Sequence, residues 1–145
     1  MKEKFLVNME LYQKILLKES VVCLIIALLG LALAITFFFG LKNYKELKVV
    51  VIRIISVIIF LSFFVLMLSY SIVLKIDANS NNFLVYEGAY TLYTKRTTTA
   101  CYMKELNDEK YNVIINTGLI PGTENKYGYV IYTKYSKVVV DYGDY

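Results

Sequence analysis

Two long runs of apolar residues, separated by only nine residues, constrain the fold of this chain more than any other feature. Residues 21–39 contain no charged side chain, and residues 49–74 contain a single one, Arg53. At 1.5 Å per residue, helices of this length are comparable to the ~30 Å hydrocarbon thickness of a bilayer. The nine residues between the runs, 40–48, are long enough only for a turn. The sequence therefore predicts a transmembrane hairpin of two antiparallel helices.

The segments around this hairpin differ in character. Residues 1–19 place apolar side chains at helical spacing among Lys and Glu, which indicates either a helix lying at the membrane surface or an extension of the first span. A cleaved signal peptide is the competing interpretation, but the first apolar run continues well past the signal-like Ala32-Leu33-Ala34. The predicted organisation is an amphipathic segment over 1–19, a hairpin over 20–74, a polar linker over 75–82 and a soluble domain over 83–145.

Small and polar residues mark the contact between the two predicted spans. Small side chains recur on one stripe of the first span, and they let two helix backbones approach closely. Two serines seven residues apart share a face of the second span, where hydroxyl groups can bond to a neighbouring helix. Arg53 is placed to reach back to the lipid headgroups as an interfacial anchor. The predicted packing residues are Ala27, Gly30, Ala34, Ser62 and Ser69.

After residue 82 the hydrophobic period changes from helical to alternating. Val, Ile, Tyr and Thr dominate short segments with turn residues between them, which is typical of hairpin-connected strands. The predicted strands are 83–87, 89–95, 99–106, 111–116, 128–134 and 136–142, and Pro121-Gly122 predicts a turn. The expected fold class is thus a membrane α-helical hairpin joined to a small all-β domain, an antiparallel barrel or sheet of five or six strands, OB- or SH3-like in size.

The residue types needed for most catalytic sites are missing. The chain has no His, so neither a Ser-His-Asp nor a Cys-His site can be built. Its two cysteines lie in different predicted segments, which predicts neither a disulfide nor a Cys-based zinc site. No phosphate-binding glycine motif is present. We therefore expect no enzymatic activity, no metal and no cofactor.

Tyrosine is the most unusual feature of the predicted β domain. The domain contains eleven tyrosines, more than the core of a domain of about 70 residues can bury, so some must be exposed. Exposed tyrosines bind flat rings or protein partners, and the alternative role is cross-strand stabilisation of the sheet. Two basic residues and a threonine run next to one of them suggest a site for a small anion. The predicted ligand-binding residues are Tyr93, Lys95, Arg96, Tyr129 and Tyr132.

Charge gives limited information on location and partners. The net charge is +4, but residues 75–145 carry eight positive and eight negative side chains, so a nucleic-acid partner is not expected. Two spans place both termini on one side of the cell membrane. The lysines near the N-terminus favour the cytoplasmic side, with the extracellular side left open. Expected partners are the bilayer, a protein or small anionic ligand, and a second copy of the chain. The composition is typical of a bacterial source.

Two functions fit this organisation. The first is a non-catalytic, membrane-anchored module whose β domain recognises a ligand or protein, for example as an accessory or immunity protein at the cell surface. The second is an effector that disrupts the membrane when a ligand binds. The order of parts is similar to that of the two-helix β-barrel effectors of bacterial cyclic-oligonucleotide anti-phage defence, but the similarity includes no motif and implies no site residue.

Overall fold

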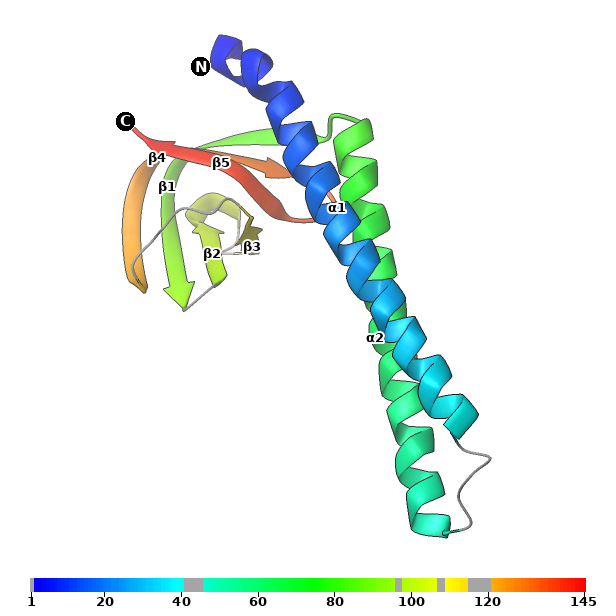
Figure 1. Cartoon of the computed structure of the whole chain (residues 1–145). Coiled ribbons are helices and arrows are strands. Elements are labelled where there is room, and N and C mark those ends of the chain that lie inside the picture. The colour runs from blue at the N-terminus through cyan, green and yellow to red at the C-terminus, as the bar shows by residue number, and fades with distance from the viewer. Residues whose placement is uncertain (1, 41–45, 96–97, 107–108, 115–120) are drawn as a thin grey trace. The chain divides into compact units, whose positions relative to one another are not determined.

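Two long helices precede five strands in the computed structural model of the chain (Figure 1). The structure describes residues 2–40, 46–95, 98–106, 109–114 and 121–145. It divides into two compact units. The helical unit is Leu17–Lys75, and the sheet unit combines Met1–Leu16 with Ile76–Tyr145. The first residues of the chain thus fold with the β domain, although some sixty residues of helical hairpin separate them in sequence.

Both predicted apolar helices are confirmed. Helix α1 spans Lys2–Phe39 and helix α2 spans Leu47–Asn79. Each is long and apolar enough to cross a membrane, and almost none of either apolar segment is buried inside the protein, which is consistent with membrane insertion. The N-terminal segment is continuous with the first span. Helix α2 also continues through the first five residues of the expected linker 75–82, so only residues 80–82 connect it to the sheet.

Small side chains line the contact between the two helices of the helical unit. Ala27 and Ala34 are buried, and a β-carbon added at Gly30 would lie 3.3 Å from the ring of Phe63. These observations agree with the predicted small-residue stripe, because a larger side chain at Gly30 would push the Phe63 ring away. Aromatic rings pack farther along the same contact, where the centroids of Phe37 and Phe60 are 5.5 Å apart.

The hydroxyl groups that join the helices are not the expected ones. Ser69 is exposed and donates to the carbonyl of Val65 in its own helix, and Ser62 is also exposed. The cross-helix pair is Ser20 and Ser71, which are buried and each donate to the other's carbonyl oxygen at 2.9 and 2.8 Å. The predicted serines share a face, but that face points away from the partner helix.

Arg53 lies over the end of the first helix. Its guanidinium carbon is 5.9 Å from the centroid of the Phe37 ring, and a β-carbon added at Gly40 would collide with its Nη1 atom. A cation at this position is favourable because the last carbonyl groups of a helix carry partial negative charge. Arg53 thus lies at the turn end of the hairpin, and its predicted role as an interfacial anchor stays a prediction.

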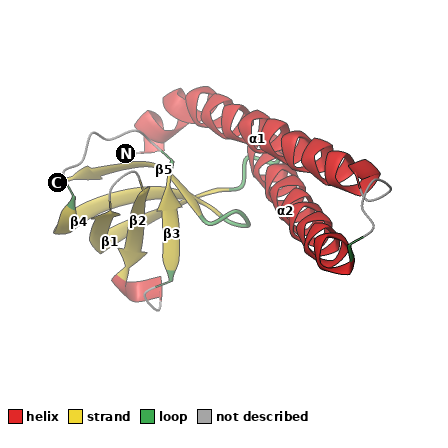
Figure 2. Ribbon diagram, turned by 60° about the horizontal axis from the view of Figure 1, so that its bottom comes forward, coloured by secondary structure: helices red, strands yellow, loops and turns green. Residues whose placement is uncertain are grey.

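The sheet contains five strands, whose pairings run in the order β1-β2-β3-β5-β4 and return to β1. The strands are β1 (Phe83–Lys95), β2 (Thr98–Met103), β3 (Lys110–Val113), β4 (Gly122–Thr133) and β5 (Val138–Asp144), with a short 3₁₀ helix, η2 (Lys104–Leu106), after β2. Figure 2 shows β4, β1, β2 and β3 side by side. The two predicted strands 83–87 and 89–95 are thus one long strand.

The prediction of an antiparallel sheet is wrong at one place, where β3 pairs with β5 in parallel. All other neighbours are antiparallel. The reason is geometrical: strand direction cannot alternate all the way round a ring with an odd number of members. The parallel link consists of two residue pairs in the described part of the chain, against twelve between β1 and β4. The domain is therefore a five-stranded mixed sheet with a narrow closing link.

Aromatic residues fill the interior of this sheet. The buried cluster is built from alternate residues of all five strands, among them Tyr86, Tyr90, Leu92, Met103 and Val130. Tyr111 and Tyr132 meet edge to face, with ring centroids 5.0 Å apart. Several of the eleven tyrosines therefore form the core, as expected for cross-strand pairs that stabilise a small sheet.

Candidate functional site

The outer face of β1, β2 and β3 carries the candidate site. Alternation along each strand sends one set of side chains inward and the other outward. In β1, Leu92 points into the core, so Tyr93 and Lys95 point out. The register then sets their neighbours: Tyr93 lies opposite Ala100, Lys95 opposite Thr98, and Ala100 opposite Asn112.

A cleft of about 160 Å³ opens on this face. Its walls carry tyrosine rings, lysine side chains and short polar groups. The lining residues are Tyr93, Lys95, Thr98, Thr99, Ala100, Tyr102, Lys110 and Asn112. The small side chain of Ala100 lies in the row between Tyr93 and Asn112, which leaves room for a ligand between them.

Among the described residues, no carboxylate pairs with the lysines of this cleft. The ion pairs of the described chain join Lys126 to Glu124 and Asp144, and Lys137 to Glu109. Neither Lys95 nor Lys110 has a carboxylate partner among the described residues. Two free ammonium groups beside tyrosine rings make the cleft suitable for an anion that also carries a flat or apolar part.

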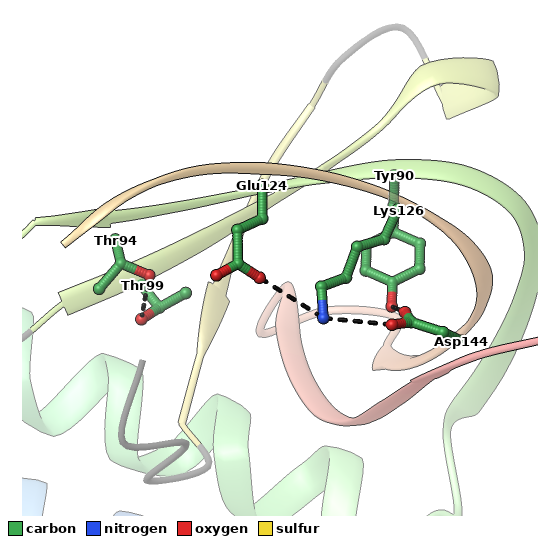
Figure 3. Close-up of polar contacts among 6 residues, drawn as sticks. All are labelled: Tyr90, Thr94, Thr99, Glu124, Lys126 and Asp144. Carbon is green, nitrogen blue, oxygen red and sulfur yellow. Dashed lines mark hydrogen bonds and ion pairs between the residues drawn. The ribbon is translucent and has the colours of Figure 1, made fainter. Parts of the chain in front are cut away.

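Polar side chains on β1 and β2 hold the end of the cleft in place. The Thr98 hydroxyl donates to the carbonyl oxygen of Lys95 at 3.1 Å, next to the turn between the strands. Between the same strands, the hydroxyls of Thr94 and of the cleft residue Thr99 are 3.2 Å apart (Figure 3). These bonds join the ends of β1 and β2, which carry Lys95 and its neighbours.

The structure brings some of the predicted ligand-binding residues together and separates others. Tyr93, which is 46 % exposed, and Lys95 both line the cleft. Arg96 lies outside the described residues. Tyr132 is buried in the core, and the ring of Tyr129 lies over Gly143 of β5, where an added β-carbon would be 2.7 Å from it. Neither of these tyrosines lines the cleft.

Four cleft residues were not predicted: Ala100, Tyr102, Lys110 and Asn112. They come from β2 and β3, and they join the site only through cross-strand register. The sequence did contain a pattern that could have indicated them: residues 99–106 and 111–116 alternate as strands do. This alternation places the side chains of Tyr102 and Cys101 on opposite faces of the sheet. The phase alone does not give the register between strands, so these residues could not be assigned to one site.

A second polar cluster lies on β1, β4 and β5 (Figure 3). The buried Tyr90 hydroxyl donates to Oδ1 of Asp144 at 2.8 Å, and Lys126 lies 3.2 Å from Oδ2 of Asp144 and 3.4 Å from Glu124. The Tyr90 hydroxyl and the Lys126 ammonium lower the pKa of Asp144 below its usual value, and the same carboxylate raises the pKa of Lys126. The cluster holds one positive and two negative side chains, and its bonds tie the C-terminal strand to the sheet.

The described residues offer no obvious reactive group. Cys101 is fully buried, and burial raises the pKa of its thiol to about 12. A thiol with this pKa is a poor nucleophile at neutral pH because the thiolate is the reactive form. Burial and the nearby Glu109 raise the pKa of Tyr111 to about 12. Within the described ranges, no three His, Cys, Asp or Glu side chains are grouped to hold a metal ion.

No protein-family model matches the chain, and neither a curated protein nor a solved structure matches it significantly.

Proposed function

We propose that this chain is a non-catalytic, membrane-anchored binding protein whose sheet unit binds a small anionic ligand in the cleft on β1, β2 and β3. The single observation that carries the proposal is the pairing of two unneutralised lysines, Lys95 and Lys110, with two tyrosine rings, Tyr93 and Tyr102, in one cleft. A surface lysine whose only role is to increase solubility does not require aromatic side chains next to it.

The order of the strands supports an OB-like rather than an SH3-like assignment. OB folds are partly open, five-stranded Greek-key barrels that bind ligands on the face of their second and third strands. The ring β1-β2-β3-β5-β4 is of this kind, and the cleft lies on β2 and β3 together with β1. The position of the cleft does not identify the ligand, since one fold serves many functions.

The size of the cleft favours a small ligand. Drug-sized ligands usually occupy clefts of roughly 300–1,000 Å³, and this cleft is about 160 Å³. A phosphate, or a single ring bearing a phosphate or carboxylate, matches that volume better than a polymer. The ammonium groups would bind the acid group, and the tyrosine rings would contact the ring.

Binding can be tested with the full chain in detergent micelles. The probes are inorganic phosphate, adenosine monophosphate and glucuronic acid, followed by calorimetry and by nuclear magnetic resonance of the probe. We expect Lys110→Ala and Lys95→Ala each to weaken binding by about 3- to 10-fold, the range for one charge-assisted hydrogen bond at a partly exposed site. Lys134→Ala is the matched control, because Lys134 is exposed and packs on Tyr135, outside the cleft.

Two results would contradict the proposal. One is that none of the three anions binds with a dissociation constant below roughly 10 mM, which corresponds to a binding free energy of only about −2.7 kcal/mol. The other is that Lys134→Ala weakens binding as much as the cleft variants, which would mean that the probes respond to overall charge.

A further inference from the structure

Two hydrogen-bonded contacts hold β5 to the helix ends that belong to the sheet unit. The first is made by Asp77, in the last turn of α2, whose side chain is completely buried. Its Oδ2 atom accepts from the backbone N–H of Ser136 and from the Ser136 hydroxyl, both at 2.7 Å. The N–H of Tyr135 points at both carboxylate oxygens from 3.3 and 3.4 Å. The turn that begins β5 is therefore attached to α2.

The second contact is made by the N-terminal part of α1. The Tyr12 hydroxyl donates to Oδ2 of Asp141 at 2.7 Å, and the Tyr12 ring packs against Phe83 with centroids 6.0 Å apart. Tyr12 is buried. Because Asp141 lies in the middle of β5, the strand is held at its start by α2 and at its centre by α1. We call these two contacts the β5 clamps.

Among the described residues, the link between β5 and β3 is short. In the described part of the chain it has two residue pairs, Asn112 with Val138 and Val113 with Val139. The Asn112 N–H donates to the Lys137 carbonyl at 3.0 Å, and the Ile114 N–H donates to the Val139 carbonyl at 3.4 Å. On its other edge β3 pairs with β2 over four residues. If the ring opens, β3 should therefore leave β5 and stay with β2.

We propose that the β3–β5 link is a conformational seam: the sheet opens there while β5 stays clamped to the helix ends and β3 moves. The opening would change the cleft, because its lining comes partly from β3 and partly from β1, which stays paired with β4 over twelve residues. Lys110 and Asn112 of the cleft lie on β3 itself. A ligand that bridges β1, β2 and β3 would then favour one arrangement of the seam. This makes the seam a two-state element that both the cleft and the helix ends can bias.

The proposal goes beyond ligand binding and is tested without any ligand, by hydrogen exchange of backbone amides in the full chain in micelles. Amides in a strand point alternately to its two neighbours. The amides of Asn112 and Ile114 face β5, so those of Tyr111 and Val113 face β2. Seam opening should make the first pair exchange at least tenfold faster than the second. The Ser136 amide, bonded to Asp77, should exchange as slowly as the second pair.

A disulfide across the seam provides the matched control. In the double variant Asn112→Cys/Val138→Cys, oxidation should slow exchange at residues 112 and 114 to the rate at 111 and 113, and reduction of the same sample should restore the difference. Equal rates at all four β3 positions in the wild type would mean that β3 frays as a whole, which overturns the proposal. Exchange of the Ser136 amide as fast as that of Asn112 would also overturn it, since β5 would then leave its clamp during opening.

Discussion

Replacing Asp77 should destabilise the sheet unit more than replacing any exposed carboxylate of the same domain. Asp77 is fully buried at the end of α2, and its carboxylate is the acceptor for two short hydrogen bonds from Ser136. The substitution Asp77→Ala removes that acceptor without changing the strand sequence. It leaves the Ser136 N–H buried with no partner, because Ser136 itself is only 8 % exposed.

The magnitude can be worked out donor by donor. A buried donor left without a partner costs about 1–3 kcal/mol, and a hydrogen bond to a charged group contributes about 1.5–3 kcal/mol. The Ser136 N–H bears the full loss. The Ser136 hydroxyl bears part of it, since it also lies 2.6 Å from the Thr133 hydroxyl and can use that partner. The Tyr135 N–H belongs to an exposed residue and its bonds are long, so water can replace them. We expect a total loss of about 2–5 kcal/mol.

Urea unfolding of the full chain in micelles measures this loss. The chain has 14 tyrosines and no tryptophan, so near-ultraviolet circular dichroism reports on tyrosine packing, most of it in the sheet unit. Asp77→Asn should give a smaller loss, because the amide retains one oxygen but turns an N–H group toward other donors. Glu124→Ala is the control, since the Glu124 side chain is 45 % exposed. A loss below about 1 kcal/mol for Asp77→Ala, or an equal loss for Glu124→Ala, would refute the reasoning.

Four other outcomes follow from the structure. Gly128→Ala should destabilise the sheet by ~1–3 kcal/mol in the same assay, because its β-carbon would collide with the backbone oxygen of Gly143, which cannot rotate away. The pKa of Asp144 is lowered in the folded protein. The stability that its carboxylate contributes is therefore present above the ordinary pKa of 3.8 and is lost as the pH falls through the lower folded value. In a plot of stability against pH, Asp144→Asn should reduce the fall in stability at acid pH. Cys101 should resist a maleimide at neutral pH until the sheet unfolds, as mass spectrometry can show, because it is buried and its thiol pKa is about 12. For this reason membrane orientation is better read from Tyr135→Cys, a position that is 56 % exposed, with an impermeant maleimide on intact cells; no labelling is expected if the sheet unit is cytoplasmic.

Features that depend on local composition were predictable from the sequence. Both helices follow from the removal of long apolar runs from water, and the strands follow from alternation between buried and exposed side chains. The break predicted at Glu87-Gly88 failed for a specific reason. A β-carbon at Gly88 would lie 2.6 Å from the Tyr86 hydroxyl, which donates to the Ala89 carbonyl. Glycine is present there because a tyrosine side chain folds over it within a continuous strand, and not because the chain turns.

Features that depend on contacts distant in sequence were not predictable. Asp77 follows an apolar helix and precedes Asn and Ser, a pattern typical of a solvated turn, yet it is buried by residues 58 and 59 positions later. The Tyr12–Asp141 bond joins residues 129 positions apart. Tyr93 and Lys95, two of the eight cleft residues, were predicted because they lie close together on one strand. Lys110 needed the register between β2 and β3, which no single-strand pattern contains.

The parallel link shows how one topological constraint connects the fold to its proposed motion. A ring of six strands can be antiparallel throughout, but a ring of five must contain one parallel pair, so closing this sheet requires a pair of that kind somewhere. The order of the strands puts it between β3 and β5, and β3 has only four residues in the described chain. Parallel pairs are slightly less stable per residue than antiparallel ones, and among the described residues this pairing is also the shortest, with two residue pairs. The weakest link thus lies between the strand clamped by the helix ends and the strand that carries Lys110, which is where a small sheet can open without breaking its core pairs.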